Sequence, residues 1–220
     1  GLADKFKEAA HRAYQFLPYM EKIFRDQNVP QPITRLAFIE SMFNTKARSK
    51  LGASGIWQFM KRTGKQYLIV NSIIDERHSP LKATRAAAKY LAQNYRTLKS
   101  WPLAITAYNH GPSALNQAIK KLKTRNLSTI IREHNTASFG YAAKNFYAEF
   151  LAAIRTYEYI KVNYFQKKPM DSQISSIILS KRMSIYQILK HSKLNPETLK
   201  EHNPCLKNKL FTQQKHTLLP

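Results

Sequence analysis

The sequence is poor in cysteine and lacks long hydrophobic runs. Cys205 is the only cysteine among 220 residues, so the chain can form neither an internal disulfide nor a cysteine metal cluster, and its fold must depend on a packed core. No run approaches the roughly 18 uncharged apolar residues that a membrane-spanning helix needs. Hydrophobic residues still make up 43% of the chain, too many for a disordered protein. These features predict a soluble globular protein with one sizeable core and a small appendage.

Acidic residues are also scarce. Thirteen Asp and Glu oppose 36 Lys and Arg, which gives a formal net charge of +23. Such a charge favours a polyanionic partner, which could be nucleic acid, an anionic lipid surface or a cell-wall polymer that carries carboxylates. Aromatic stacking platforms interleaved with Lys and Arg are not evident, and this disfavours nucleic acid.

Apolar residues recur every three or four positions through the first three quarters of the chain, which predicts a mainly α domain over residues 1–165. The predicted helices cover residues 5–27, 32–43, 57–68, 80–97, 102–109, 112–122, 127–133 and 139–164. Small residues nearly all round the helix at 80–97 predict that it is central, because other helices can approach it closely. The helix at 139–164 is apolar nearly all round, which predicts a second buried helix.

A basic, proline-containing stretch at residues 166–172 is typical of a linker, and a second unit follows over residues 173–220. In this unit we expect a strand at 176–180, helices at 185–191 and 196–202, and a closing strand at 217–219. The expected order is therefore β-α-α-β.

Glu40 is the most informative residue. At helical spacing it continues the apolar stripe of Ile33, Leu36 and Ala37, so a carboxyl group lies where a hydrophobic side chain is expected. Burial penalises the charged form and raises the pKa of an acid toward the range in which it can donate a proton near neutral pH. Taken alone, Glu40 could equally lie at the helix end with its side chain in solvent.

Three motifs follow in order: Glu40-Ser41, then Gly-Ala-Ser-Gly-Ile-Trp-Gln at residues 52–58, then Ala-Tyr-Asn-His-Gly-Pro at residues 107–112. Over about residues 30–160 the chain resembles the soluble lytic transglycosylases, which are relatives of goose-type lysozyme. The resemblance implies a lysozyme-like helical domain in which Glu40 is the catalytic acid. It also implies that Ser49, Gln58, Tyr108 and Asn109 bind substrate and that Ser41 supports Glu40 from behind.

Residue chemistry gives these positions plausible tasks. Gly52 and Gly55 permit backbone conformations closed to other residues, and Ser49 and Gln58 offer hydrogen-bonding groups for sugar amides or hydroxyls. The Tyr108 hydroxyl could point toward Glu40 and hold its carboxyl group in place, although a tyrosine at such a position is more often part of a core.

Some positions differ from the family. Trp57 and His110 replace smaller residues, so we expect a bulkier cleft wall in which Trp57 stacks on a sugar, and His110 could instead be an ordinary helix-end residue. In the last helix the family's tyrosine aligns with Phe146, with Tyr147 adjacent as a further substrate-binding candidate. The family's nearby glutamate falls on Ala142.

A second catalytic carboxylate is missing. Between Asn28 and Asn145 the only other acids are Asp75, Glu76 and Glu133, and we expect the first two to cap the following helix. Ordinary glycosidases use two carboxylates, so the sequence predicts chemistry with one. In the scheme that the resemblance implies, Glu40 cleaves the bond between N-acetylmuramic acid and N-acetylglucosamine and yields a 1,6-anhydromuramyl end; attack by water instead would make a lysozyme.

The C-terminal unit resembles a degenerate LysM module, a type that binds N-acetylglucosamine chains, but it has Arg182-Met183-Ser184 where that module has Gly-Asp-Thr. The sequence thus predicts an exported monomeric enzyme, periplasmic or extracellular, that acts on peptidoglycan glycan strands without metal or other cofactor. The alternatives are an inactive glycan-binding protein and a basic nucleic-acid-binding protein.

Overall fold

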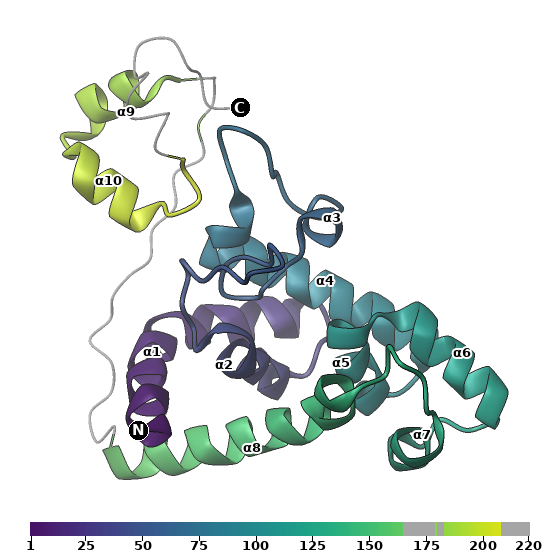
Figure 1. Ribbon diagram of the computed structural model, residues 1–220. Helices are drawn as coiled ribbons and strands as arrows, with labels where there is room; N and C mark the ends of the chain where they lie inside the picture. Colours follow the sequence, from purple (N-terminus) through teal and green to yellow (C-terminus); the bar gives the residue numbers. More distant parts are fainter. Residues whose placement is uncertain (165–178, 180–182, 208–220) are drawn as a thin grey trace.

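The computed structural model describes residues 1–164, 179 and 183–207. In these ranges the chain forms ten α-helices and two 3-10 helices (Figure 1). Their order is α1 (Leu2–Asp26), η1 (Gln31–Arg35), α2 (Leu36–Ser41), α3 (Lys61–Gly64), η2 (Glu76–His78), α4 (Pro80–Leu98), α5 (Trp101–His110), α6 (Pro112–Leu122), α7 (Leu127–Glu133), α8 (Tyr141–Tyr164), α9 (Ile185–Ser192) and α10 (Pro196–His202).

α4 is the centre of the main body, as the sequence predicts. It contacts α1, α5, α6 and η2. Its small residues are buried along one side, and they are Ala83, Ala86, Ala87 and Ala88. Because alanines let helix backbones approach closely, α4 can pack against several neighbours at once. The predicted mainly helical fold is confirmed for this body.

α8 differs from its prediction as a helix buried all round. It runs along one side of the body (Figure 1), and its buried residues fall on a single stripe that includes Phe146, Phe150 and Tyr157. Tyr159 and Val162 on the same helix are 63% and 76% exposed. The helix therefore has more apolar residues than the core buries.

The predicted helix at 32–43 is divided in two. A 3-10 helix begins beside Pro32, and α2 follows and ends at Ser41 because Met42 and Phe43 have positive φ angles of 52° and 57°. A left-handed residue ends an α-helix. Glu40 consequently lies in the last turn of a short helix rather than in the middle of a long one.

The predicted helix at 57–68 is mostly wrong, since only α3 is helical there. Residues 44–59 form an irregular loop held by isolated bridges from Ser54 to Arg48 and to Phe59. Gly55 has a φ of +77°, and a Cβ atom there would lie 1.7 Å from the Arg77 carbonyl oxygen. Only glycine permits this close approach, so the loop is packed directly onto the segment before α4.

The C-terminal helices α9 and α10 lie where the sequence predicts them. Ser184 and Asn195 cap them by accepting hydrogen bonds from the backbone N–H groups of Gln187 and Thr198. The predicted strands at 176–180 and 217–219 lie outside the described residues, apart from Leu179, which is not in a strand. The described part of the chain contains no strand, so the β-α-α-β order is not supported.

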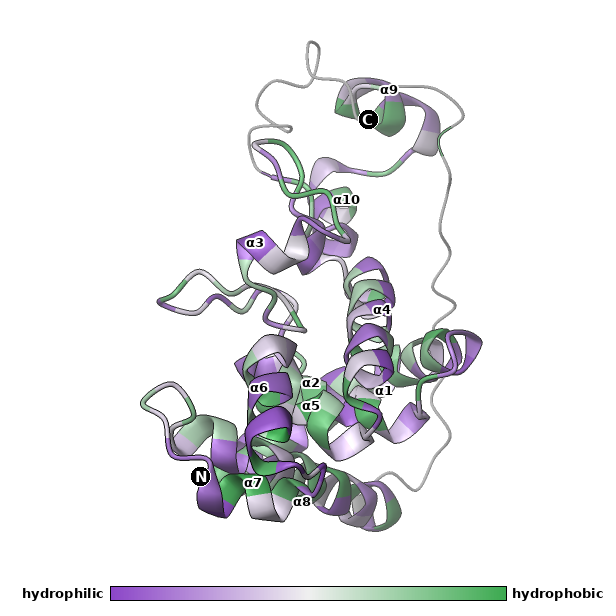
Figure 2. Cartoon of the chain, turned by 90° about the vertical axis from the view of Figure 1, so that its right-hand side faces the viewer, coloured by the Kyte–Doolittle hydropathy of each residue, from purple (hydrophilic) through white to green (hydrophobic). Residues whose placement is uncertain are grey.

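Hydrophobic residues form separate clusters in the main body and in the C-terminal part. Figure 2 shows that hydrophobic stretches occur along the helices of both parts. The C-terminal cluster is completed by the main body: Ile74, from the segment before α4, is buried with Ile185 and Leu199. No helix in the described ranges is long and apolar enough to cross a lipid bilayer.

Candidate active site

Glu40 lies in the last turn of α2 with only a minor part of its surface exposed, where α2 contacts α8. Burial of the carboxyl group, with a smaller contribution from the negative charge of Glu149 on α8, raises the pKa of Glu40 from 4.5 to about 8. An acid with this pKa is protonated at neutral pH and can donate its proton. The solvent-exposed alternative for Glu40 is therefore not what the structure shows.

Glu149 is a functional candidate that the sequence did not reveal. It is exposed on α8, a full 109 positions after Glu40, yet its charge acts on the Glu40 carboxyl group. The family's glutamate aligns with Ala142, which is exposed two turns earlier on the same helix.

Tyr108 reaches the site from α5. Its hydroxyl donates a hydrogen bond to the Trp57 carbonyl oxygen at 2.8 Å, so this proton is directed to the loop backbone and not to Glu40. Burial, then the charges of Glu40 and Tyr90, raise the pKa of Tyr108 well above its usual value. Tyr108 is thus a neutral group that joins α5 to the loop at 44–59 close to Glu40.

Ser41 joins the same loop to α2. Its hydroxyl donates to the Ile56 carbonyl oxygen at 2.8 Å. The carbonyl group of residue 56 is thus bonded to α2, which carries Glu40. The next carbonyl group, of residue 57, is bonded to α5, which carries Asn109. Ser41 thus lies next to Glu40 in sequence and contacts the loop with its side chain.

Ser49 and Gln58 hold the loop from within. The Ser49 hydroxyl accepts a hydrogen bond from the Ala53 backbone N–H at 2.9 Å, and the Gln58 amide donates to the Gly55 carbonyl oxygen at 2.8 Å. Gln58 has a positive φ of 46°, which is rare for a residue with a side chain. Ser49 is exposed and Gln58 partly exposed, so both retain surface for a ligand.

Trp57 does not line a cleft, which corrects the expectation that it stacks on a sugar. The side chain is 0% exposed, and its ring stacks on Phe24 at 5.5 Å between centroids. Its indole N–H donates to the Thr84 hydroxyl at 2.9 Å. The bulk that the sequence assigns to the cleft wall instead fills the core between α1 and α4.

The remaining candidates lie at the end of α5 and in the second turn of α8. Asn109 is exposed, and Tyr147 is partly buried against Phe150. His110 is the last residue of α5 and lies edge-on to Phe139. Burial, followed by the nearby His134, lowers the pKa of His110, opposite to the effect of a helix C-terminus on a histidine.

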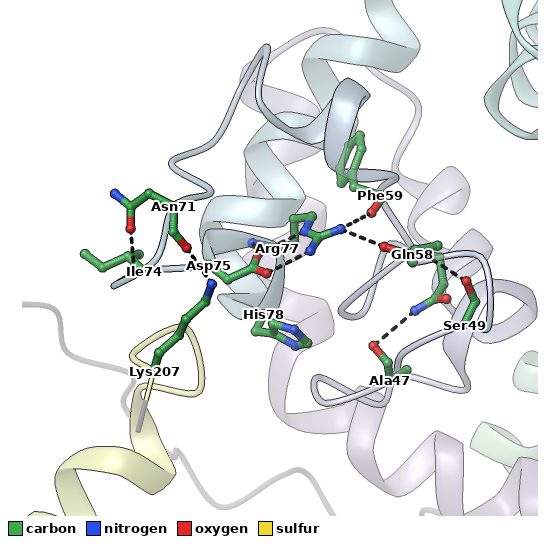
Figure 3. A network of polar contacts seen from close by, with 12 residues as sticks. Ala47, Ser49, Gln58, Phe59, Asn71, Ile74, Asp75, Arg77, His78 and Lys207 are labelled. Atoms are coloured by element: carbon green, nitrogen blue, oxygen red, sulfur yellow. Dashed lines mark hydrogen bonds and ion pairs between the residues drawn. The ribbon is translucent and has the colours of Figure 1, made fainter. Parts of the chain in front are cut away.

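A buried ion pair supports the loop from its other side. Arg77 binds Asp75 through two hydrogen bonds of 2.9 and 2.8 Å, and its remaining nitrogen donates to the carbonyl oxygens of Gly52 and Phe59 at 2.9 and 3.0 Å. Figure 3 shows Arg77 between Asp75 and the loop that carries Ser49. Burial alone would raise the pKa of Asp75, but its bonds to Arg77 and the charge of Arg77 outweigh this and lower it.

The sequence had assigned Asp75 and Glu76 to capping of the helix that begins at Pro80, but Ser79 precedes that helix and no side chain caps it. Asp75 instead caps η2, and Glu76 binds both Lys82 and the Ile69 backbone N–H. Among the described residues, no group of three or more His, Cys, Asp and Glu side chains is arranged to hold a metal ion.

Fold and site together define a lysozyme-like helical domain in which burial raises the pKa of one acid, Glu40, to about 8. The family model described as "Transglycosylase SLT domain" matches residues 19–131, and the chain belongs to this family. The matched range holds Glu40 and all three motifs, whereas Tyr147 and Glu149 lie beyond it.

Individual relatives agree with this assignment. Membrane-bound lytic murein transglycosylase D of Escherichia coli K12 is 31% identical over 120 residues, which are 54% of this chain and 26% of that protein. Membrane-bound lytic murein transglycosylase F of Pseudoalteromonas translucida is 32% identical over 94 residues, covering 39% of this chain and 19% of that protein. The chain thus spans about a quarter or less of the length of these relatives.

A solved structure shares the fold. An inactive mutant of lytic transglycosylase Slt from Pseudomonas aeruginosa superposes with a TM-score of 0.53 at 20% identity, covering 70% of this chain and 26% of that one.

Proposed function

We propose that this protein is a lytic transglycosylase that cleaves the glycan strands of peptidoglycan. The observation that carries the proposal is Glu40, which lies within the range matched by the family model and whose pKa is raised to about 8 by burial beside α8. The curated relatives are named lytic murein transglycosylases, which supports the same substrate class.

Protonated Glu40 begins the reaction. It donates its proton to the oxygen between N-acetylmuramic acid and N-acetylglucosamine, and the C1–O bond breaks with assistance from the muramyl acetamide. The Glu40 carboxylate then takes the proton of the muramyl C6 hydroxyl as that oxygen bonds to C1. The products are a free N-acetylglucosamine end and a 1,6-anhydromuramyl end, and Glu40 regains its proton.

Other side chains of the site position the sugar in this proposal. Ser49, Gln58, Tyr108, Asn109 and Tyr147 bind the strand, and Ser41 keeps α2 fixed to the loop through its 2.8 Å bond to Ile56. The exposure of Ser49 and Asn109 and the partial exposure of Gln58 and Tyr147 are consistent with these roles. Trp57 acts only through the core.

The experiment compares Glu40→Gln with Glu133→Gln on purified peptidoglycan. Glu133 is an exposed acid at the end of α7 and serves as the matched control. We expect Glu40→Gln to lose strand cleavage and Glu133→Gln to retain it, also in the presence of a chelator. Undiminished cleavage by Glu40→Gln would remove Glu40 from the mechanism.

Mass spectrometry of the products separates two outcomes of the same site. Muramyl ends one water lighter than hydrolysis products identify a transglycosylase, whereas full-weight reducing ends identify a lysozyme. Absence of any cleavage together with retained strand binding would favour the inactive glycan-binding alternative. Binding of nucleic acid that weakens steeply with rising salt concentration would favour the nucleic-acid-binding alternative.

We propose the domain boundaries that the sequence predicts: a catalytic domain at 1–165, a linker at 166–172 and a C-terminal unit at 173–220. We also propose export to the compartment that holds the cell wall, and action as a monomer. We also propose a LysM-like role for the C-terminal unit; α9 and α10 lie where the sequence predicts them, but the described part of the chain contains no strand of such a module.

A further inference from the structure

A cavity of about 560 Å³ lies where the C-terminal part meets the main body, and Glu40 is not among its lining residues. From the main body it is lined by Lys46 and Arg48 in the loop after α2 and by His78 before α4. From the C-terminal part, α10 contributes Lys200 and Glu201. Its volume is within the range of sites for small ligands.

Backbone contacts fix the two walls of this cavity relative to one another. Residue 74 pairs with Leu206 in an antiparallel bridge, the Asp75 N–H donates to the Cys205 carbonyl oxygen at 2.9 Å, and the Lys207 N–H donates to the Ile73 carbonyl oxygen at 3.0 Å. The two walls of the cavity are therefore joined by backbone hydrogen bonds across the interface.

The lining side chains carry both signs of charge. In the described part of the chain, three lining cations form no ion pair with an acid: Lys46, Arg48 and Lys200. The opposing acids Glu197 and Glu201 form no ion pair with a cation there. Asp75, which also lines the cavity, is neutralised by Arg77. The walls thus present unpaired cations together with unpaired carboxylates.

One buried acceptor adds to this set. His78 is 4% exposed, and its Nδ1 contacts the Thr45 carbonyl oxygen at 2.7 Å, so Nδ1 carries the proton. Nε2 is then an acceptor, and it is buried without a hydrogen-bond partner. Buried polar atoms normally have partners, so this nitrogen is an unsatisfied acceptor beside the cavity.

We propose that this cavity binds the peptide attached to the glycan strand, recognising its carboxylates through Lys46, Arg48 and Lys200 and its free amine through Glu197 and Glu201. The inference rests on the proposed function, since it concerns the same polymer. A polyphosphate fits poorly because the two glutamates would repel it, whereas a peptide with both carboxylates and a side-chain amine matches both signs of charge.

The cavity is connected to the loop at 44–59. Lys46 and Arg48 lie between Glu40 and Ser49 in sequence, and Asp75 reaches the loop carbonyl groups of Gly52 and Phe59 through Arg77 (Figure 3). Peptide bound there would hold the strand against the same loop that positions the sugar.

The first test measures binding in the full chain carrying Glu40→Gln, so that no turnover occurs. The probe is a synthetic acidic tetrapeptide that contains one diamino acid. Its binding is measured by titration calorimetry. We expect binding that weakens about tenfold or more when Arg48→Ser and Lys200→Ser are combined. Lys190→Ser, an exposed lysine of α9 outside the cavity, is the matched control and should leave the affinity unchanged.

Cys205 provides an independent readout, because it is the only thiol of the chain and lines the cavity. Bound tetrapeptide should slow its alkylation, and a tetrapeptide with amidated carboxylates should not. No detectable binding at millimolar peptide, or equal binding of the amidated peptide, would overturn the proposal.

Activity then links the cavity to the polymer. The Arg48→Ser, Lys200→Ser variant should lose more activity on peptide-bearing strands than on strands stripped of peptide. Equal losses on both polymers would contradict a peptide site. If the unmodified protein cleaves neither polymer, the proposed function fails, while the calorimetry and the alkylation still decide whether the cavity binds peptide.

Discussion

At the scale of the residue, the acid at the centre of the site works against the stability of the fold. The pKa of Glu40 is 4.5 in an unfolded chain and about 8 in the fold, so the folded state retains a proton that the unfolded state loses between these values. Folding stability from this group is therefore highest below pH 4.5 and falls as the pH rises toward 8.

Glu40→Gln should consequently stabilise the protein in a pH-dependent way. We expect a melting temperature above that of the unmodified protein at pH 8, by roughly 2–4 °C for each kcal/mol recovered, and no difference at pH 4. Thermal unfolding followed by circular dichroism at both pH values measures this. Glu133→Gln, at an exposed acid, should change neither value, and a Glu40→Gln gain that is equal at both pH values would argue against burial as its cause.

The negative charge of Glu149 should be visible in the pH dependence of cleavage. Glu149→Gln removes the repulsion that adds to the effect of burial, so the pKa of Glu40 falls and the alkaline limit of activity moves to lower pH. The shift of this alkaline limit is measured from rates of wall cleavage between pH 5 and 9. Each variant is compared with the unmodified protein. The control is Glu158→Gln on the same helix, where the carboxylate contacts Arg35 instead. A profile that is lower but unshifted would assign Glu149 a purely structural role.

The residues of the site differ in how far sequence could predict them. Glu40 is evident because it interrupts an apolar stripe. Glu149 is not, because its relation to Glu40 depends on which face of α8 packs against α2. Trp57 was misassigned since position within a motif does not tell whether a side chain faces the ligand or the core.

At the scale of the element, the loop at 44–59 is held in a non-helical conformation by hydrogen bonds from side chains to its carbonyl groups. The sequence predicts a helix from residue 57, but positive φ angles at Gly55 and Gln58 are incompatible with one. Helices that start at a proline or a capping side chain, such as α4, α6 and α7, were predicted within a residue or two of their ends. Local signals thus define helices well, whereas this loop depends on a partner, Arg77, that follows it in sequence.

Arg77→Met should therefore damage both stability and the loop. Loss of one partner leaves Asp75 buried and unpaired and frees the carbonyl groups of Gly52 and Phe59, and such changes cost about 3–5 kcal/mol. Urea unfolding measures the loss. Lys22→Met, which breaks the exposed pair with Asp26, is the control and should cost under about 1 kcal/mol. Similar small losses in both variants would show that the buried pair does not hold the loop.

At the scale of the whole molecule, the C-terminal helices are docked on the catalytic body rather than independent of it. The sequence predicted a separate module after a linker, because composition changes near residue 166. It could not show that Ile74 completes the core of α9 and α10, since an isoleucine in a loop has no periodic pattern to assign it to a partner.

Ile74→Asn should release the C-terminal helices while leaving the main body folded. A polar side chain in the cluster with Ile185 and Leu199 is left without a partner, and the bridge to Leu206 opens with it. We expect faster alkylation of Cys205, whose backbone is held by Asp75, with little loss of helical circular dichroism. Ile69→Asn is the matched control, because Ile69 lies in the same segment but is 42% exposed, and it should leave the alkylation rate unchanged. If Ile74→Asn also leaves that rate unchanged, the docked arrangement does not depend on this contact, and the cavity at the interface loses the element that fixes its two walls.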